Sequence, residues 1–338
     1  MSNISRRHLL AGTGALAAAT AIPTAAQPTE TVSLKGKSFL VTGASSGFGN
    51  AGVLLYARLG ARVFATMRNL PRPEAEELMR IAREEKLDLQ VLPLDVLSDE
   101  QVATAVAEAE KRNGGPLDVL VNNAGIYIGG PLEVHDMEAT RLAFDTNVFG
   151  YQRTARAVLP GMRSRKSGLI FNVSSQQGRI LRPGSGMYSA TKFAVEAMSE
   201  QMAYEVAPYG IEVVIIEPGG FPTRIGANRV RYTAALLARA EEKHTAGYPQ
   251  LVAQMRPVAD ERARAVAAPA AAYGSATIPD PIDVPRAIAE IAAMPAGSRP
   301  LRRPVHPGPK PQEAINRVSL ETQRTLLAKD AWALGVLD

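Results

Sequence analysis

Thr42-Gly43-Ala44-Ser45-Ser46-Gly47-Phe48-Gly49 is the stretch that decides the fold of this chain. It follows a short apolar run at 38–41 and leads into a helical pattern. A strand, a glycine-rich turn and a helix in this order predict a βαβ unit that binds a dinucleotide. Gly43 permits the tight turn, Gly47 lets the main chain approach a pyrophosphate, and Gly49 lets helix and strand pack closely. The N-terminus of the helix would then face the phosphates.

The end of the next apolar run, at 62–66, indicates which dinucleotide is bound. An acidic residue about 20 residues past the glycine turn would bind the ribose 2′-hydroxyl of NAD. This chain has Ala65-Thr66-Met67-Arg68 there instead. Arg68 can pair with a 2′-phosphate and Ser46 can hydrogen-bond to it. The sequence therefore favours NADP(H) over NAD(H), although a solvated surface arginine would give the same pattern.

Strand and helix patterns alternate from here to the 220s. Strands are expected at 38–41, 62–66, 89–94, 119–121, 169–173 and 211–216, and helices at 47–59, 74–85, 98–113, 137–163 and 188–208. This alternation predicts an α/β fold with a doubly wound parallel sheet, the Rossmann fold.

The pattern is weaker after 223. We expect one domain at 35–307 with a helical insertion that covers the substrate at 224–279, followed by a C-terminal helical extension at 308–338. Helices are expected at 230–244, 250–268, 282–294 and 313–334, and 300–309 is rich in proline. Since proline cannot donate to a ladder, any strand in 300–309 must lie at a sheet edge.

Polar and small residues stand where the expected strands end. Asp95-Val96 could meet an adenine edge, and Asn122-Asn123-Ala124-Gly125 would let a cofactor lie against the main chain. Ser174-Ser175 ends the strand at 169–173. Each of these, taken alone, is also typical of an ordinary turn or cap.

Tyr188-Ser189-Ala190-Thr191-Lys192 is the expected centre of the chemistry. Residues four apart on a helix share one face, so the Lys192 cation would favour the Tyr188 phenolate. A tyrosine whose pKa is lowered in this way can act as a general acid or base. Many amphipathic helices carry such a pair by chance. Asn147, within the helix expected at 137–163, needs polar partners there.

Together these motifs resemble the short-chain dehydrogenase/reductase family, closely over 35–223 and loosely over 280–307. Ser175 lies thirteen residues before Tyr188, as the family pattern requires. Residues 65–69 and the long tail look most like the 17β-hydroxysteroid and retinol dehydrogenase-type branch.

The resemblance implies a catalytic tetrad of Asn147, Ser175, Tyr188 and Lys192. Tyr188 would exchange a proton with the substrate oxygen, and Ser175 would orient that oxygen. Lys192 would lower the pKa of Tyr188 and bind the nicotinamide ribose, and Asn147 would hold a relay water. The implied cofactor residues are Gly43, Ser45, Ser46, Gly47, Phe48, Gly49, Arg68, Asp95, Val96, Asn122, Asn123, Ala124, Gly125, Tyr188, Lys192, Pro218, Gly219 and Thr223.

The expected substrate is a hydrophobic ketone, aldehyde or alcohol, because Leu181, Met187, Phe221 and Pro222 should line its pocket. Three alternatives remain. An epimerase or dehydratase on this scaffold would show no net cofactor turnover. A non-catalytic NADP-binding regulator would often lack one member of the tetrad. A purely structural protein would be equally stable without cofactor.

The composition indicates which metal sites, disulfides and binding partners are not expected. The chain has 338 residues, 46% hydrophobic, with a net charge of +5, no Cys and 4 His. A zinc site and a disulfide framework are not expected, and no basic stripe predicts nucleic-acid binding. The expected partners are a small-molecule substrate and a second copy of the chain in a homodimer or homotetramer.

The N-terminal segment 1–26 does not read as part of the fold. Arg6 and Arg7 precede a short, mildly apolar run that ends in Pro23-Thr24-Ala25-Ala26. This resembles a twin-arginine export signal, and it is too weakly apolar for a stable membrane span. We expect a periplasmic or secreted protein, or a cytoplasmic one if the signal is not used.

Overall fold

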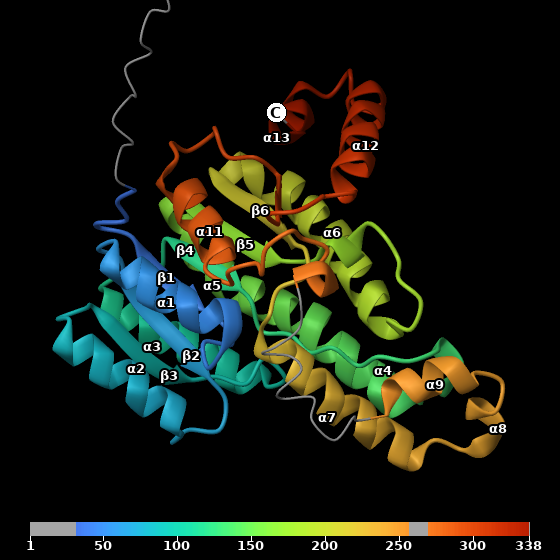
Figure 1. Ribbon diagram of the computed structural model, residues 1–338. Helices are drawn as coiled ribbons and strands as arrows, with labels where there is room; N and C mark the ends of the chain where they lie inside the picture. The colour runs from blue at the N-terminus through green and yellow to red at the C-terminus, as the bar shows by residue number, and fades with distance from the viewer. Residues whose placement is uncertain (1–31, 257–269, 338) are drawn as a thin grey trace, which may run out of the picture. The chain divides into compact units, whose positions relative to one another are not determined.

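The computed structural model describes residues 32–256 and 270–337. The expected signal segment lies outside them, as does the end of the helix expected at 250–268. Seven strands form one parallel sheet in the order β3-β2-β1-β4-β5-β6-β7 (Figure 1). They are β1 (Ser38–Val41), β2 (Arg62–Met67), β3 (Leu89–Pro93), β4 (Val119–Asn122), β5 (Gly168–Val173), β6 (Ile211–Pro218) and β7 (Arg302–Val305). The predicted doubly wound parallel sheet is confirmed.

Two layers of helices enclose the sheet, as the βαβ connections require. On one face lie α1 (Gly47–Arg58), α2 (Pro73–Glu84) and α11 (Asp283–Ala293). On the other lie α3 (Asp99–Asn113), α5 (Gly150–Arg165) and α6 (Met187–Val206). The helices α1 and α11 lie side by side in Figure 1.

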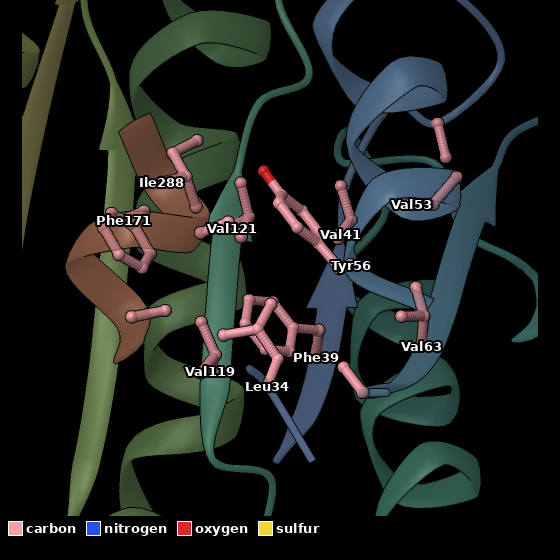
Figure 2. Packing of buried hydrophobic residues seen from close by; sticks show 14 of the residues in the cluster. Leu34, Phe39, Val41, Val53, Tyr56, Val63, Val119, Val121, Phe171 and Ile288 are labelled. Atoms are coloured by element: carbon pink, nitrogen blue, oxygen red, sulfur yellow. The ribbon is translucent and has the colours of Figure 1, made fainter. Parts of the chain in front are cut away.

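The core between β1, β4 and α1 is built from strands that are apolar on both faces. Phe39 stacks on Tyr56 of α1 with ring centres 4.9 Å apart, and both are almost fully buried. Figure 2 shows these rings beside Val119 and Val121 of β4. Each such side chain contributes about 1.5–3 kcal/mol by leaving water. This packing holds the carboxyl ends of β1 and β4 next to each other.

The neighbouring strands β1 and β4 mark the point at which the winding of the sheet reverses. The chain runs outward from β1 to β2 and β3 on one side, and from β4 to β5, β6 and β7 on the other. Ligands of open α/β sheets bind outside the carboxyl ends of the strands at such a point. The glycine-rich turn and the Asn122–Gly125 motif both begin there.

The helix expected at 137–163 is interrupted. It is α4 (Met137–Phe144), then a π-helical turn at Asp145–Phe149, then α5. The Asp136 side chain accepts a hydrogen bond of 2.7 Å from the Ala139 N–H and caps α4. Asn147 lies in the π-helical turn, an irregularity that often occurs at functional sites.

The segment after β6 differs from the expected helices. It contains α7 (Arg224–Arg239), α8 (Glu242–Thr245) and α9 (Pro249–Met255). The helix α7 begins six residues earlier than the helix expected at 230–244, and its Leu236 packs in a cluster with Val252, Ile126 and Ala139. The substrate-covering role of 224–279 stays a prediction.

The C-terminal elements lie at the far edge of the sheet. Proline-containing β7 is an edge strand, as predicted. The single helix expected at 313–334 is instead α12 (Gln312–Leu326) and α13 (Ala331–Leu337). Trp332 of α13 packs edge-on against Tyr204 of α6, with ring centres 6.4 Å apart.

A buried charged cluster joins these C-terminal elements to the sheet. Glu217 of β6 is fully buried and accepts hydrogen bonds of 3.0 and 2.7 Å from the Asn316 amide of α12. Arg302 of β7 lies 3.7 Å from Glu217 and pairs with Glu196 and Glu200 of α6. Burial raises the pKa of Glu217 to about 8, and repulsion from Glu196 is the second largest cause of the rise.

We expect Glu217→Gln to reduce the pH dependence of stability between about pH 4.5 and 8. Because the folded state holds this proton more tightly than the unfolded chain, wild-type stability falls as pH rises through that range. The urea midpoint of the variant minus that of the wild type should therefore increase as pH rises from 5 to 8. Glu212→Gln, on the same strand, is the control. Parallel pH profiles for wild type and Glu217→Gln would contradict the assignment.

Candidate active site

The glycine-rich turn forms one wall of a cavity of about 370 Å³ at the carboxyl ends of the strands. Gly43 has a positive φ of 70°, and a Cβ there would lie 2.9 Å from the Ala124 Cα. At Gly49 a Cβ would lie 2.6 Å from the Asn123 Nδ2. Only glycine at these two positions therefore lets the turn and the start of α1 pack against Asn123 and Ala124, which follow β4. The expected residues of the turn that line the cavity are Gly43, Ser45, Ser46, Gly47 and Phe48.

The N-terminus of α1 opens onto this cavity. Ser46, at the N-cap, makes no side-chain capping hydrogen bond, so the first N–H groups of the helix have no side-chain cap. A helix start of this kind favours anions such as a pyrophosphate. The residues present thus fit a dinucleotide.

The ends of β2 and β3 form the second wall. Arg68 lines the cavity and its Nη2 donates a 3.2 Å hydrogen bond to the Tyr232 hydroxyl of α7. Asp95 and Val96 line it too. The Asp95 carboxylate also accepts a 3.1 Å hydrogen bond from the Leu97 N–H, which shapes the turn into α3.

The four residues after β4 divide into two groups. Asn123, Ala124 and Gly125 line the cavity, and the Asn123 amide donates a 2.9 Å hydrogen bond to the Thr42 carbonyl. Asn122 points inward, where its amide donates to Asn172 and accepts from Thr154. Its side chain links strands and helix within the core and does not line the cavity.

Ser175, Tyr188 and Lys192 lie together at one end of the cavity. Ser175 follows β5, and its hydroxyl accepts a 3.1 Å hydrogen bond from the Gln177 N–H. Lys192 is buried and donates a 2.8 Å hydrogen bond to the Val173 carbonyl. Its Nζ lies 5.8 Å from the centre of the Tyr188 ring, as expected for residues one helical turn apart.

The ionisation of the Tyr188–Lys192 pair differs from the expectation. Burial raises the pKa of Tyr188, and a hydrogen bond with Ser175 offsets part of the rise. Burial also lowers the pKa of Lys192 to about 8, against the raising effect of Glu196. The expected lowering of the Tyr188 pKa by Lys192 is not seen, because desolvation of the phenol outweighs a cation 5.8 Å from its ring.

Asn147 does not line the cavity, yet it supports the residues that do. Its amide oxygen accepts a 2.8 Å hydrogen bond from the Ile126 N–H. Its amide nitrogen donates to the Ile126 carbonyl at 2.9 Å and to the Thr191 hydroxyl at 3.0 Å. Asn147 thereby ties the chain after β4 to α6 beside Tyr188. These bonds use both amide hydrogens and one lone pair of the amide oxygen, so a relay water could bind only at the second lone pair of that oxygen.

The four expected substrate residues are not equivalent. Phe221 is buried, lines the cavity and packs edge-on against Phe48 with ring centres 5.4 Å apart. Leu181 is 72% exposed, and neither it nor Met187 nor Pro222 lines the cavity. The other expected residues of this segment, Pro218, Gly219 and Thr223, do line it.

Tyr127 is a neighbour of Tyr188 that the sequence analysis missed. The two rings stack with centres 4.3 Å apart, and the Tyr127 hydroxyl donates a 3.2 Å hydrogen bond to Ser185. The Arg229 guanidinium of α7 lies 5.3 Å from the centre of the Tyr127 ring. In the sequence, Tyr127 stands two residues after Gly125, and this position could have indicated that it lies near the site. Arg72, Arg224 and Arg231 are further cavity residues that were not expected.

Comparison with known protein families assigns the chain. The model of the short chain dehydrogenase family matches residues 37–233. This chain belongs to the short-chain dehydrogenase family. It is therefore classed with oxidoreductases, as expected. A second model, for twin-arginine translocation signal sequences, matches residues 3–23 and suggests export. Within the described residues no helix is long and apolar enough to cross a membrane.

Two relatives illustrate the similarity. A 3-ketodihydrosphingosine reductase of Bacteroides thetaiotaomicron is 39% identical over 56% of this chain and 66% of its own length. Human retinol dehydrogenase 8 is 38% identical over 54% of this chain and 58% of its own length. These matches are consistent with the expected retinol and hydroxysteroid-type branch, and they span less than two thirds of each relative.

Solved structures show the same fold in this oxidoreductase class. A short-chain dehydrogenase from Streptomyces avermitilis has 30% identity and a TM-score of 0.61, over 87% of this chain and 97% of its own. Actinorhodin polyketide ketoreductase, solved with NADPH, has 26% identity and a TM-score of 0.63, over 80% and 96%. A gluconate 5-dehydrogenase from Burkholderia cenocepacia, solved with NADP and tartrate, has 32% identity and a TM-score of 0.54, over 62% and 82%.

Proposed function

We propose that this protein is an NADP(H)-dependent oxidoreductase that interconverts a hydrophobic ketone or aldehyde and its alcohol. One observation carries the proposal: a serine, a tyrosine and a lysine line the same cavity as Arg68. Proton transfer and recognition of a 2′-phosphate would thus occur in one continuous space.

In the reductive direction Tyr188 would donate its phenolic proton to the carbonyl oxygen. The phenol is protonated at neutral pH, but burial raises its pKa, so release of the proton requires stabilisation of the phenolate. The Ser175 hydroxyl would hydrogen-bond the same oxygen and orient it. When bound, a reduced nicotinamide supplies the hydride.

Lys192 and Asn147 would support the proton donor. The Lys192 ammonium, held by the Val173 carbonyl, would stabilise the phenolate formed when the proton leaves. Asn147 would act as a positioning residue, since it ties Ile126, which precedes Tyr127, to Thr191 in the same helix as Tyr188.

The residues present support NADP(H) as the cofactor. The glycine cradle and the N-terminus of α1 suit a pyrophosphate, and the end of β2 offers an arginine where an NAD enzyme would offer an acid. Two structural relatives were solved with NADP or NADPH and another with NAD, so the preference rests mainly on Arg68.

An apolar carbonyl compound is the proposed substrate class. Phe221 and Ile225 bring apolar side chains to the cavity that Tyr188 also lines. The names of two relatives point to a ketone in one case and to an alcohol, retinol, in the other.

We propose export through the signal at 3–23 as the route of the protein out of the cytoplasm.

Incubation of the purified chain with NADPH and a panel of apolar ketones and aldehydes tests the function. We expect loss of NADPH absorbance with equal formation of the alcohol. The same panel with small polar ketones is the control. An epimerase or dehydratase would change the substrate with no net loss of NADPH. A regulator would bind NADPH and consume none with any member of the panel.

A further inference from the structure

Arginines from two distant parts of the chain face each other across the cavity. Arg68 and Arg72 come from the end of β2 and the turn that follows it, and Arg224 and Arg231 come from α7. The ordinary site for a 2′-phosphate needs only the first of these. The helix α7 therefore lines the same cavity as Arg68 and contributes cations to it.

A tyrosine on α7 connects the two sides. Arg68 donates its 3.2 Å hydrogen bond to the hydroxyl of Tyr232. The guanidinium carbon of Arg231 lies 4.8 Å from the centre of the same ring. Arg68 and Arg231 therefore contact the same side chain, one at its hydroxyl and the other over its face.

The four arginines differ in how their charges are balanced. Arg72 and Arg224 both pair with Glu74 of α2, each at 2.9 Å. In 32–256 and 270–337, no carboxylate forms an ion pair with Arg68 or Arg231. The Asp95 carboxylate is close enough to raise the pKa of Arg68 slightly, after the larger effect of Tyr232. Two guanidinium groups at the cavity thus lack a full counter-charge, which a phosphate would supply.

We propose that α7 carries the second half of the 2′-phosphate site, with Arg231 and Arg68 binding the same phosphate and Tyr232 positioning both. This inference rests on the proposed use of NADP(H). It makes Arg231 a residue that determines cofactor preference, although it lies in the segment expected to cover only the substrate. Glu74 ties α7 to α2 next to the site through Arg224.

Adenosine 2′,5′-bisphosphate and 5′-AMP are matched probes because they differ only in the 2′-phosphate. Calorimetric titration of the full chain should show that Arg231→Gln weakens the bisphosphate roughly 10- to 100-fold, the range for hydrogen bonds to a charged group. Binding of 5′-AMP should be unchanged. Arg229→Gln, which removes the same charge from the same helix at a residue that does not line the cavity, should leave both affinities unchanged.

A double-mutant cycle decides whether the two arginines share one phosphate. We expect the loss in Arg68→Gln/Arg231→Gln to be smaller than the product of the two single losses. Melting temperatures of all variants check that they fold. If the single losses multiply, the two arginines bind separate groups and the shared site is wrong.

The test separates this inference from the proposed function. Wild-type preference for the bisphosphate, abolished by Arg68→Gln and unaffected by Arg231→Gln, would overturn the role of α7 and leave the NADP(H) proposal intact. Equal affinity of the wild type for the two probes would overturn both.

Discussion

Tyr188→Phe is expected to lower the turnover of a carbonyl substrate by roughly 10²- to 10⁴-fold, the usual value of positioned acid–base help. The phenol lines the cavity with Ser175 and Lys192, and it carries its proton at neutral pH. The phenyl ring of the variant can keep the stacking contact with Tyr127. NADPH affinity should therefore change little while kcat falls.

Steady-state kinetics with a titration of NADPH fluorescence measures both effects. Tyr56→Phe is a matched control, because it removes a buried hydroxyl from α1, away from the cavity. Its kcat should equal that of wild type. Near-full turnover in Tyr188→Phe with intact NADPH binding would show that another group supplies the proton.

Lys192→Met is expected to lower kcat to a similar extent, and to lower NADPH affinity as well. The ammonium is proposed both to stabilise the phenolate and to bind the nicotinamide ribose, so its loss affects catalysis and binding together. Wild-type reductive activity should fall as pH rises above about 8, where the Lys192 side chain loses its proton. The variant should lack this decline.

The stability of the same variant gives a second readout. Because burial lowers the pKa of folded Lys192, the unfolded chain binds this proton more tightly than the folded protein. Wild-type stability should rise with pH between about 8 and 10.5, and the rise should be smaller in Lys192→Met. Urea midpoints across this range measure it. An unchanged pH profile of activity in Lys192→Met would show that this amine does not control the reaction.

The alternation of apolar strands with helical patterns was enough to predict the fold. Apart from the edge strand β3, the first six strands are short runs that are largely buried on both faces, and that pattern is local in sequence. The prolines around 300–309 likewise predicted an edge position for β7. Element boundaries were less predictable where tertiary contacts decide them, as in the π-helical turn around Asn147 and the early start of α7.

The candidate site was predicted in part. The glycine turn, Arg68, Ser175, Tyr188 and Lys192 do meet at one cavity, because motifs at the carboxyl ends of parallel strands share one edge of the sheet. Asn122 turned inward because its amide finds partners in Thr154 and Asn172. No local pattern distinguishes it from Asn123, which faces the cavity.

The alternation of strands and helices, the glycine-rich turn and the spacing of the proposed acid–base residues could be read from the sequence, since these depend on neighbours along the chain. Only the tertiary structure decided the stacking of Tyr127 on Tyr188 and the ionisation of Tyr188 and Lys192. It also brought Arg231 and Tyr232 opposite Arg68. These features depend on burial and on contacts between residues far apart in the chain, for which the sequence carries no periodic signal.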